Sequence, residues 1–300
     1  MRIGRAAATT DTGLRRRANE DAYVFRPPLF AVADGMGGAR AGEVAAQLAA
    51  AALEEAGTET KGEAGIVALI EEANRRIWER AIRDPATSGM GTTVTAALVD
   101  ETSGQVAIGH VGDSRAYLLR GGSLEQLTTD HSLVAELVQS GVLTPEEAER
   151  HPQRSAITRA LGTEASVRVE TFTVAAEVGD LFLLCSDGLS AMLDDDEVAA
   201  AIEGAGGEPA HAGAALVTAA NEHGGEDNIT VVLFELLEGD PAPAEPAPEQ
   251  ASPEVATTTA ENANGVRTHG AGQGGRAAAI ALVVAIVALG LLAVYWGITR

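Results

Sequence analysis

The chain has 300 residues, enough for one large hydrophobic core and an appended segment. Its 43 acidic residues outnumber 21 Lys and Arg and give a net charge of −22, so binding to nucleic acid is disfavoured. The one cysteine, Cys185, excludes a disulfide framework and a cysteine-rich zinc site, and we expect an intracellular enzyme or binding domain.

Residues 1–239 alternate irregularly between apolar runs that end in turn residues and segments with helical spacing. The apolar runs predict strands within 29–35, 92–100, 105–120, 180–188 and 228–236. Helical spacing predicts helices over 42–56, 66–82, 132–141, 194–204 and 209–224. The Gly-Gly pair at 121–122 lies between two short runs and predicts a β-hairpin. Because strands and helices do not alternate regularly, we expect an α+β fold.

The composition changes abruptly near Asp240. Residues 240–276 are rich in Pro, Ala and Gly without hydrophobic periodicity, which predicts a disordered linker. Residues 277–296 contain no charged residue, amide or proline, and as a helix they would span about 30 Å, the thickness of a bilayer core. A buried soluble helix is the less favoured alternative, because it would show a polar stripe. We therefore expect a C-terminal transmembrane helix and a short outer tail at 297–300.

The charges around this segment predict its orientation. Arg267 and Arg276 precede it and only Arg300 follows, so the positive-inside rule places residues 1–276 in the cytoplasm. The first residues contain no apolar stretch typical of a signal peptide. We expect a single-pass protein of the cell membrane with a cytoplasmic domain over 1–239.

Four aspartates each stand beside Gly or Asn at the end of an apolar run: Asp34, Asp113, Asp187 and Asp227. A carboxylate in such a place is delivered to the edge of a rigid sheet, where several of them would repel one another. A divalent cation removes that repulsion, and Mg²⁺ or Mn²⁺ prefers oxygen ligands. A single Asp-Gly pair is more often a plain turn, but four in one domain favour a metal site.

A charged segment near the N-terminus, GLRRRANEDA, holds Arg16, Glu20 and Asp21. Arginine is suited to bidentate contact with phosphate oxygens, and the two acids follow it closely enough to reach the same cleft. Taken alone, a solvated charge cluster remains the alternative interpretation.

These segments together resemble a known family. The chain is similar, over residues 3–237, to the bacterial branch of the metal-dependent serine/threonine protein phosphatases of type 2C. The motifs that carry the resemblance come in order: R-x-x-N-E-D (16–21), DGMGG (34–38), GMGTT (89–93), GDSR (112–115), the stretch 128–162, CSDGL (185–189) and EDNIT (226–230). The resemblance implies a four-layer α/β/β/α sandwich of two antiparallel sheets flanked by helices, with a binuclear metal centre at one edge.

The resemblance also implies a ligand set for two or three Mn²⁺ or Mg²⁺ ions. Asp34 would bridge both metals of the binuclear centre, and Asp187 and Asp227 would complete the first site. The second site would use the carbonyl oxygen of Gly35, with Glu20 acting through bound water. A hydroxide held between the two ions would then attack phosphorus directly.

Further roles follow from the same resemblance. Arg16 would hold the substrate phosphate, Asp21 would orient metal-bound waters, and Asp113 would join a third, weaker metal. The segment 140–162 corresponds to a mobile flap beside the cleft. Met36 stands where animal members have a histidine proposed to protonate the leaving group, so the general acid is unassigned, with metal-bound water as the candidate.

The function implied is hydrolysis of phosphoserine and phosphothreonine in proteins. The partners implied are phosphorylated proteins, among them membrane Ser/Thr kinases and their substrates. The alternative is a catalytically silent scaffold or ligand-sensing module with the same fold. A cysteine phosphatase is excluded, because Ala191 stands six residues after Cys185, where that chemistry requires arginine.

Overall fold

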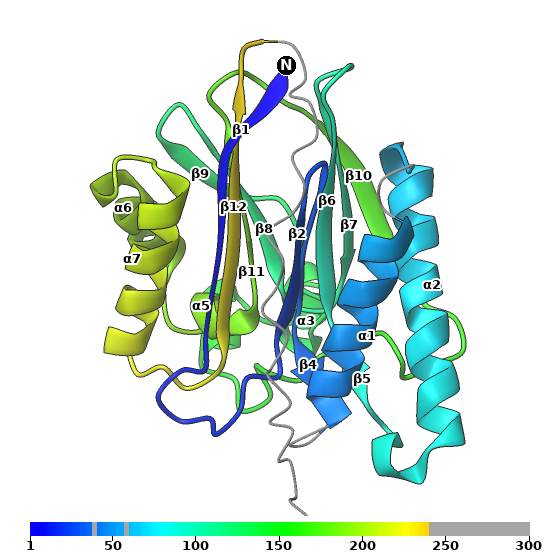
Figure 1. Cartoon of the computed structure of the whole chain (residues 1–300). Coiled ribbons are helices and arrows are strands. Elements are labelled where there is room, and N and C mark those ends of the chain that lie inside the picture. The colour runs from blue at the N-terminus through cyan, green and yellow to red at the C-terminus, as the bar shows by residue number, and fades with distance from the viewer. Residues whose placement is uncertain (38–40, 57–59, 240–300) are drawn as a thin grey trace, which may run out of the picture. The chain divides into compact units, whose positions relative to one another are not determined.

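Two five-stranded antiparallel sheets form the centre of the computed structural model, which describes residues 1–37, 41–56 and 60–239 (Figure 1). The first sheet has the order β1 (Arg2–Asp11), β12 (Ile229–Leu237), β11 (Leu181–Cys185), β8 (Arg115–Arg120), β9 (Ser123–Gln126). The second has the order β10 (Glu170–Ala175), β7 (Gln105–Val111), β6 (Val94–Asp100), β3 (Leu29–Ala33), β2 (Ala22–Arg26).

Helices cover the outer face of each sheet, so the chain forms the predicted α+β sandwich (Figure 1). The second sheet packs against α1 (Ala41–Ala56) and α2 (Gly62–Arg83), and the first against α6 (Asp195–Gly204) and α7 (Pro209–Glu222). The predicted helices match these bounds closely, because each has apolar residues at helical spacing. In α2 that spacing buries one face: Ile66, Leu69, Ile70, Ala73, Asn74, Ile77 and Ala81.

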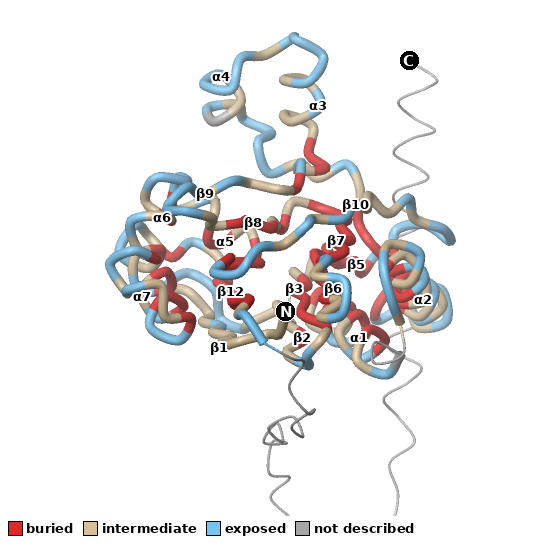
Figure 2. The backbone as a smooth tube through the Cα atoms, turned by 90° about the horizontal axis from the view of Figure 1, so that it is seen from above, coloured by how far each residue is buried: buried red, intermediate tan, exposed pale blue. Residues whose placement is uncertain are grey.

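The space between the two sheets is filled by aliphatic side chains and one aromatic stack. Phe234 of β12 lies between Phe30 of β3 and Phe182 of β11, with ring centroids 4.3 and 5.0 Å away. All three rings are fully buried, and they are three of the five phenylalanines in the chain. This stack therefore joins the sheets where aromatic residues are otherwise scarce. Figure 2 shows that the buried segments lie in the interior, along the strands and on the sides of the helices that face the sheets.

Shorter elements lie at the edges of the sandwich. β4 (Gly35–Met36) follows β3 and pairs with β5 (Gly91–Thr92) in a two-stranded antiparallel sheet, and α5 (Asp187–Ser190) follows β11. A 3-10 turn, η2 (Pro85–Thr87), follows α2. The helices α3 (Leu133–Gln139) and α4 (Pro145–Glu149) belong to a lobe that projects from the body (Figure 2) and contains most of the predicted flap.

One predicted strand feature is confirmed, and two features of the observed strands differ from the prediction. The hairpin at 121–122 is confirmed: β8 and β9 pair around Gly121 and Gly122, whose φ angles of 58° and 82° suit glycine. The run 105–120 is not one strand, because the chain turns at Gly112 (φ 118°) and β7 and β8 belong to different sheets. The strands β1, β2 and β10 were not predicted.

Among the described residues, no helix has the length and apolar character needed to cross a bilayer. The predicted linker (240–276), transmembrane helix (277–296) and outer tail (297–300) lie outside the described residues.

Candidate metal centre

Four aspartates meet at one edge of the sandwich because each lies at the end of a strand. Asp34 follows β3, Asp113 lies in the turn between β7 and β8, Asp187 begins α5 directly after β11, and Asp227 precedes β12. All four line an open cleft of about 590 Å³. The cleft is also lined by Arg16, Glu20, Gly35 and Met36, so these sequence-predicted residues are brought together.

The carboxyl groups perturb one another strongly. Burial and the charges of Asp187, Asp21 and Asp113 raise the pKa of Asp34 well above its ordinary value. Burial and Asp227 raise the pKa of Asp187, and burial and Asp187 raise the pKa of Asp113 to about 7. The raised pKa values mean that the nearby basic groups and hydrogen-bond donors do not balance the negative charge of these carboxylates.

One oxygen in this group has no partner in the described part of the chain. Asp187 Oδ1 is buried and accepts no hydrogen bond from any described residue. A buried carboxylate oxygen without a donor is costly, and a cation beside it would supply the missing partner. Together with the mutual perturbation of the carboxyls, this orphaned oxygen fits a divalent ion held by oxygen ligands.

The described residues do not form a complete cage by themselves. Within residues 1–37, 41–56 and 60–239, no three Asp, Glu, His or Cys side chains are arranged to hold one ion directly. Mg²⁺ and comparable hard ions keep several waters and take few protein ligands, so this arrangement remains compatible with a water-rich site. The donors present are carboxylates and a backbone carbonyl, the kind that such ions prefer.

Threonines that the sequence analysis did not single out fix the position of Asp34. The Thr93 hydroxyl accepts a hydrogen bond from Asp34 N–H at 3.2 Å, and the Thr92 hydroxyl donates to Asp34 C=O at 2.8 Å. Both threonines lie in the GMGTT segment, so this motif fixes the backbone of Asp34. Of the motif, Thr93 alone lines the cleft. No local signal identifies this role, because 58 residues separate Thr92 from Asp34.

Asn228 connects the N-terminal loop to the cleft. Its Oδ1 accepts a hydrogen bond from Glu20 N–H at 2.8 Å, and its Nδ2 donates to the carbonyls of Thr12 and Ala18 at 2.9 and 3.0 Å. Asn228 is itself almost fully buried. It therefore fixes the loop that carries Arg16 and was missed by the sequence analysis, where only its neighbouring aspartate was weighed.

Asp21 lies behind the cleft and is not part of its lining. Its carboxylate accepts a hydrogen bond of 2.6 Å from the Thr230 hydroxyl. Burial raises the pKa of Asp21 to about 7, and the charges of Asp187 and Asp227 add to that effect. The residue thus sits one layer away from the aspartates that face the cleft.

A pair of glycines lets the start of α1 approach the metal centre. A Cβ added to Gly42 would lie 2.3 Å from Glu20 Oε2 and 2.7 Å from Gly35 O, and a Cβ on Gly35 would lie 2.4 Å from Gly42 O. Neither contact is possible for a larger residue without a shift of backbone. The DGMGG and AGE segments therefore have glycine at Gly35 and Gly42, where the backbones of the two segments are in close contact.

Arg16 is engaged by one of the aspartates. Its Nη2 forms an ion pair of 2.6 Å with Asp227 Oδ2, and half of its side chain remains exposed. Asp227 Oδ1 accepts a second bond from Asn228 N–H at 2.8 Å. The sequence analysis placed phosphate on Arg16 and metal on Asp227, and it did not foresee that these two side chains bind each other.

Two stacked histidines lie under the projecting lobe. His110 and His131 have ring centroids 4.6 Å apart, and both are buried. His131 Nδ1 accepts a hydrogen bond from Gly112 N–H at 3.0 Å, beside Asp113. Burial and the neighbouring His131 lower the pKa of His110 to about 3. These rings support the base of the lobe and do not line the cleft.

Comparison with known proteins agrees with this architecture. A family profile described as protein phosphatase 2C matches residues 18–214. The serine/threonine phosphatase stp of Listeria welshimeri is 42% identical over 238 residues, which cover 75% of this chain and 93% of that protein. The serine/threonine protein phosphatase PstP of Mycobacterium tuberculosis is 42% identical over 239 residues, which cover 79% of this chain and 46% of PstP.

Solved structures give the same result. The crystal structure of Mycobacterium tuberculosis PstP superposes with a TM-score of 0.74 at 42% identity, covering 79% of this chain and all of that one. A catalytic domain of PstP solved with two manganese ions has a TM-score of 0.72 at 39% identity, covering 79% and 99%. The profile, the relatives and the shared sandwich agree, and the chain belongs to the protein phosphatase 2C family.

Proposed function

We propose that this protein is a metal-dependent serine/threonine protein phosphatase whose cleft binds two or three Mn²⁺ or Mg²⁺ ions. The observation that carries the proposal is the orphaned Asp187 Oδ1 among carboxyls that raise one another's pKa in a single cleft. The family of the chain supports it, and so does the PstP domain solved with two manganese ions.

We assign the ligands as follows. Asp34 would hold both ions, Asp187 and Asp227 would complete one site, and the Gly35 carbonyl with Glu20 through water would serve the other. Asp113 belongs to a third, weaker site, and Asp21 orients bound waters through its place behind the cleft. When bound, such a pair of ions lowers the pKa of water enough for hydroxide to form near neutral pH.

Arg16 has two partners in this assignment, Asp227 and the substrate phosphate. It now binds Asp227 Oδ2. Its remaining guanidinium N–H groups can donate to a substrate phosphate, and rotation away from Asp227 would free Oδ2 for an ion. Arg16 neutralises charge on the phosphate oxygens as bonds change at phosphorus. Met36 has no proton to give to the leaving oxygen, and water held by the ions would be the candidate donor in its place.

The test uses the purified full chain with a phosphothreonine peptide, in Mn²⁺ or in EDTA. We expect metal-dependent turnover that Asp187→Asn lowers at least about 100-fold, because a ligand is lost. Asp194→Asn is the matched control: Asp194 caps α6 and has no place in the cleft. Turnover that ignores EDTA would contradict the assignment. A folded chain without turnover on any phosphopeptide would favour the scaffold.

We further infer that residues 277–296 anchor the enzyme to the cell membrane, with the catalytic domain (1–239) in the cytoplasm. The uncharged apolar run supports this, and the linker (240–276) gives the domain a reach of roughly 35 Å. Confinement raises the local concentration of membrane Ser/Thr kinases and their substrates. Deleting 277–296 should preserve turnover in solution and release the protein from the membrane fraction. Equal dephosphorylation of membrane proteins in cells by both forms would remove the role of the anchor.

A further inference from the structure

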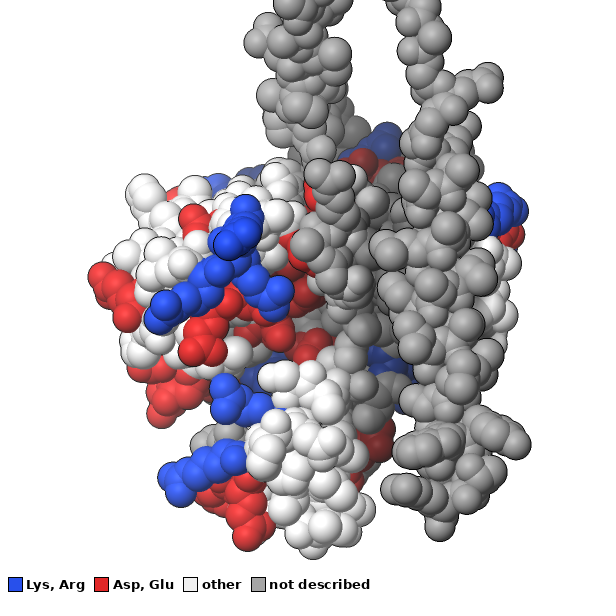
Figure 3. All heavy atoms as spheres, turned by 90° about the horizontal axis from the view of Figure 1, so that it is seen from below, with Lys and Arg blue, Asp and Glu red and all other residues white. Residues whose placement is uncertain are grey.

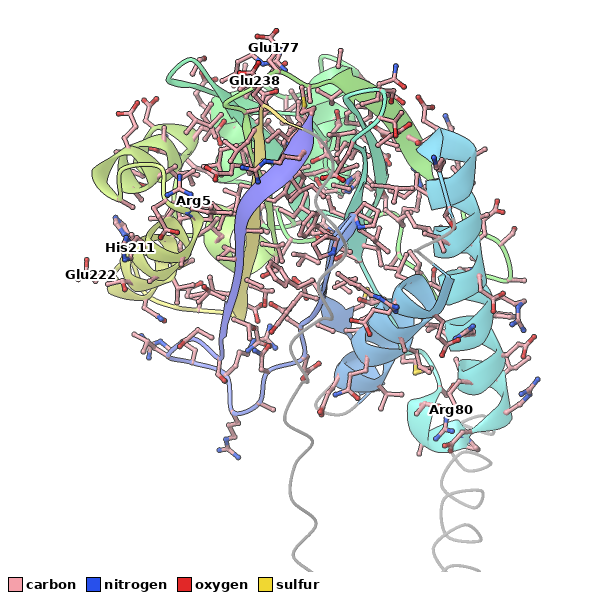
Figure 4. The ribbon with its side chains drawn as sticks, turned by 45° about the horizontal axis from the view of Figure 1, so that its top comes forward. Arg5, Arg80, Glu177, His211, Glu222 and Glu238 are labelled. Atoms are coloured by element: carbon pink, nitrogen blue, oxygen red, sulfur yellow. The ribbon has the colours of Figure 1, made fainter. Side chains whose placement is uncertain are left out.

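Two arginines at the lip of the cleft, Arg15 and Arg17, have no acidic partner among the described residues. Arg15 and Arg17 are exposed and form no ion pair or side-chain hydrogen bond with any described residue. Several other described arginines are neutralised by an acid: Arg5 pairs with Glu235, Arg80 pairs with Asp84 (both arginines are labelled in Figure 4), and the neighbouring Arg16 pairs with Asp227. The same holds for Arg75, Arg76, Arg83, Arg115 and Arg120.

The position of these two side chains is fixed by the loop that carries them. Leu14 and Arg15 donate their N–H groups to Gly225 C=O at 2.8 and 3.2 Å, and the Ala18 carbonyl accepts from Asn228 at 3.0 Å. The loop is therefore held on both sides of the arginines. A loop anchored in this way presents its cations at a defined place with little loss of conformational entropy.

Arg15 and Arg17 line the same cleft as the aspartates, with Ser155 and Ile157 from the base of the projecting lobe. Seen from below, Figure 3 shows basic side chains lying across the acidic ones on this face of the molecule. An anionic polypeptide approaching a chain of net charge −22 is repelled, and most strongly beside clustered carboxylates. Free guanidinium groups at the lip reverse that repulsion locally.

We propose that Arg15 and Arg17 form a subsite for a second anionic group of the substrate, next to the phosphorylated residue that is hydrolysed. The proposal rests on the phosphatase function above and adds a substrate class to it. A guanidinium group binds carboxylate or phosphate in bidentate fashion, so the second group is an acidic side chain or another phosphate. Neutralisation of the aspartate cluster is the competing explanation, and it predicts an equal effect on all substrates.

The experiment uses the full chain with Mn²⁺ and three phosphothreonine peptides of equal length. The residue two positions from the phosphothreonine is Ala, Glu or a non-hydrolysable phosphonate analogue of phosphothreonine. The readout is the ratio of kcat/KM for each anionic peptide to that for the Ala peptide. This ratio is independent of the fraction of active enzyme, so partial misfolding of a variant does not affect it.

We expect a ratio of about ten for the unmodified chain, which corresponds to about 1.4 kcal/mol. In the double variant Arg15→Gln/Arg17→Gln the ratio should fall to about one, mainly through KM, and added salt should lower it in the unmodified chain. Arg2→Gln is the control, because Arg2 is the first residue of β1, and the length of that strand, about 30 Å, separates Arg2 from the loop. It should keep the ratio.

Each outcome decides something. A ratio that is unchanged in the double variant, or kcat/KM that falls equally on all three peptides, overturns the subsite. A preference for the phosphonate peptide alone identifies the second group as phosphate, and a preference for both admits carboxylate. If no peptide is hydrolysed, the proposed function fails. The subsite is then tested by fluorescence anisotropy of the same labelled peptides, where equal affinities with and without the two arginines reject it.

Discussion

His110 is expected to make the fold sensitive to mild acid. The side chain is fully buried on β7, with Nδ1 2.9 Å from the Thr95 hydroxyl and Nε2 3.2 Å from the Thr129 carbonyl. Burial and the adjacent His131 lower the pKa of His110 from 6.5 to about 3. Between these two values the unfolded chain binds a proton that the folded chain does not, so stability falls as pH falls.

The size of the effect follows from the shift. Each pH unit inside this window is worth about 1.4 kcal/mol, and little is lost above pH 6.5. Lowering the pH from 7 to 5 should therefore cost about 2 kcal/mol of unfolding free energy at this one residue. That is a large fraction of the stability of an ordinary domain.

The assay compares the unmodified chain with His110→Gln by urea unfolding in EDTA at pH 7, 6 and 5. The variant lacks the titrating ring, so the difference in unfolding free energy should narrow by about 2 kcal/mol between pH 7 and 5. Asp21 and Asp113 titrate in the same range with the opposite sign, but both chains contain them. A difference that is constant within about 0.5 kcal/mol would refute the reasoning. An NMR titration midpoint of His110 near 6.5 would do the same.

Three further changes test the packing and the metal centre. Phe234→Ala should lower the unfolding free energy by about 3–5 kcal/mol in urea unfolding, since it removes the middle ring of the stack; a loss below about 1 kcal/mol would mean that the sheets close over the gap. Gly42→Ala should reduce turnover and stability by displacing Glu20, whereas Gly204→Ala, at the end of α6 with open space around it, should leave turnover unchanged; equal effects would exclude the close contact as the cause. Asp21→Asn should stabilise the metal-free chain at pH 8, because it removes a buried charge, and should weaken Mn²⁺ binding about 10–100-fold in calorimetry; unchanged Mn²⁺ affinity would remove Asp21 from the site.

The local part of the fold could be predicted from the sequence, and the long-range part could not. The helices follow from apolar spacing within one segment, as α2 illustrates with its buried face. β1 has mainly Ala, Thr and Arg and shows no strand pattern, and it becomes a strand because it pairs with β12 more than 200 residues later. The run 105–120 has one apolar pattern, yet Gly112 sends its halves to different sheets.

The candidate site divides in the same way. The aspartates could be grouped because each stands next to one end of an apolar run, a feature visible in the sequence, and the structure places them in one cleft. The supports could not be predicted, since Thr92 and Asn228 act across long sequence separations. The ion pair of Arg16 with Asp227 likewise depends on two loops that meet only in the folded chain.

The placement of Cys185 has a consequence for chemistry outside the cleft. The thiol lies on β11 with no exposed surface, and burial raises its pKa to about 12. Peroxide and alkylating reagents attack thiolates that are accessible, and this sulfur is neither ionised nor reachable. Oxidants that inactivate enzymes by attacking a nucleophilic cysteine therefore have no such target at Cys185.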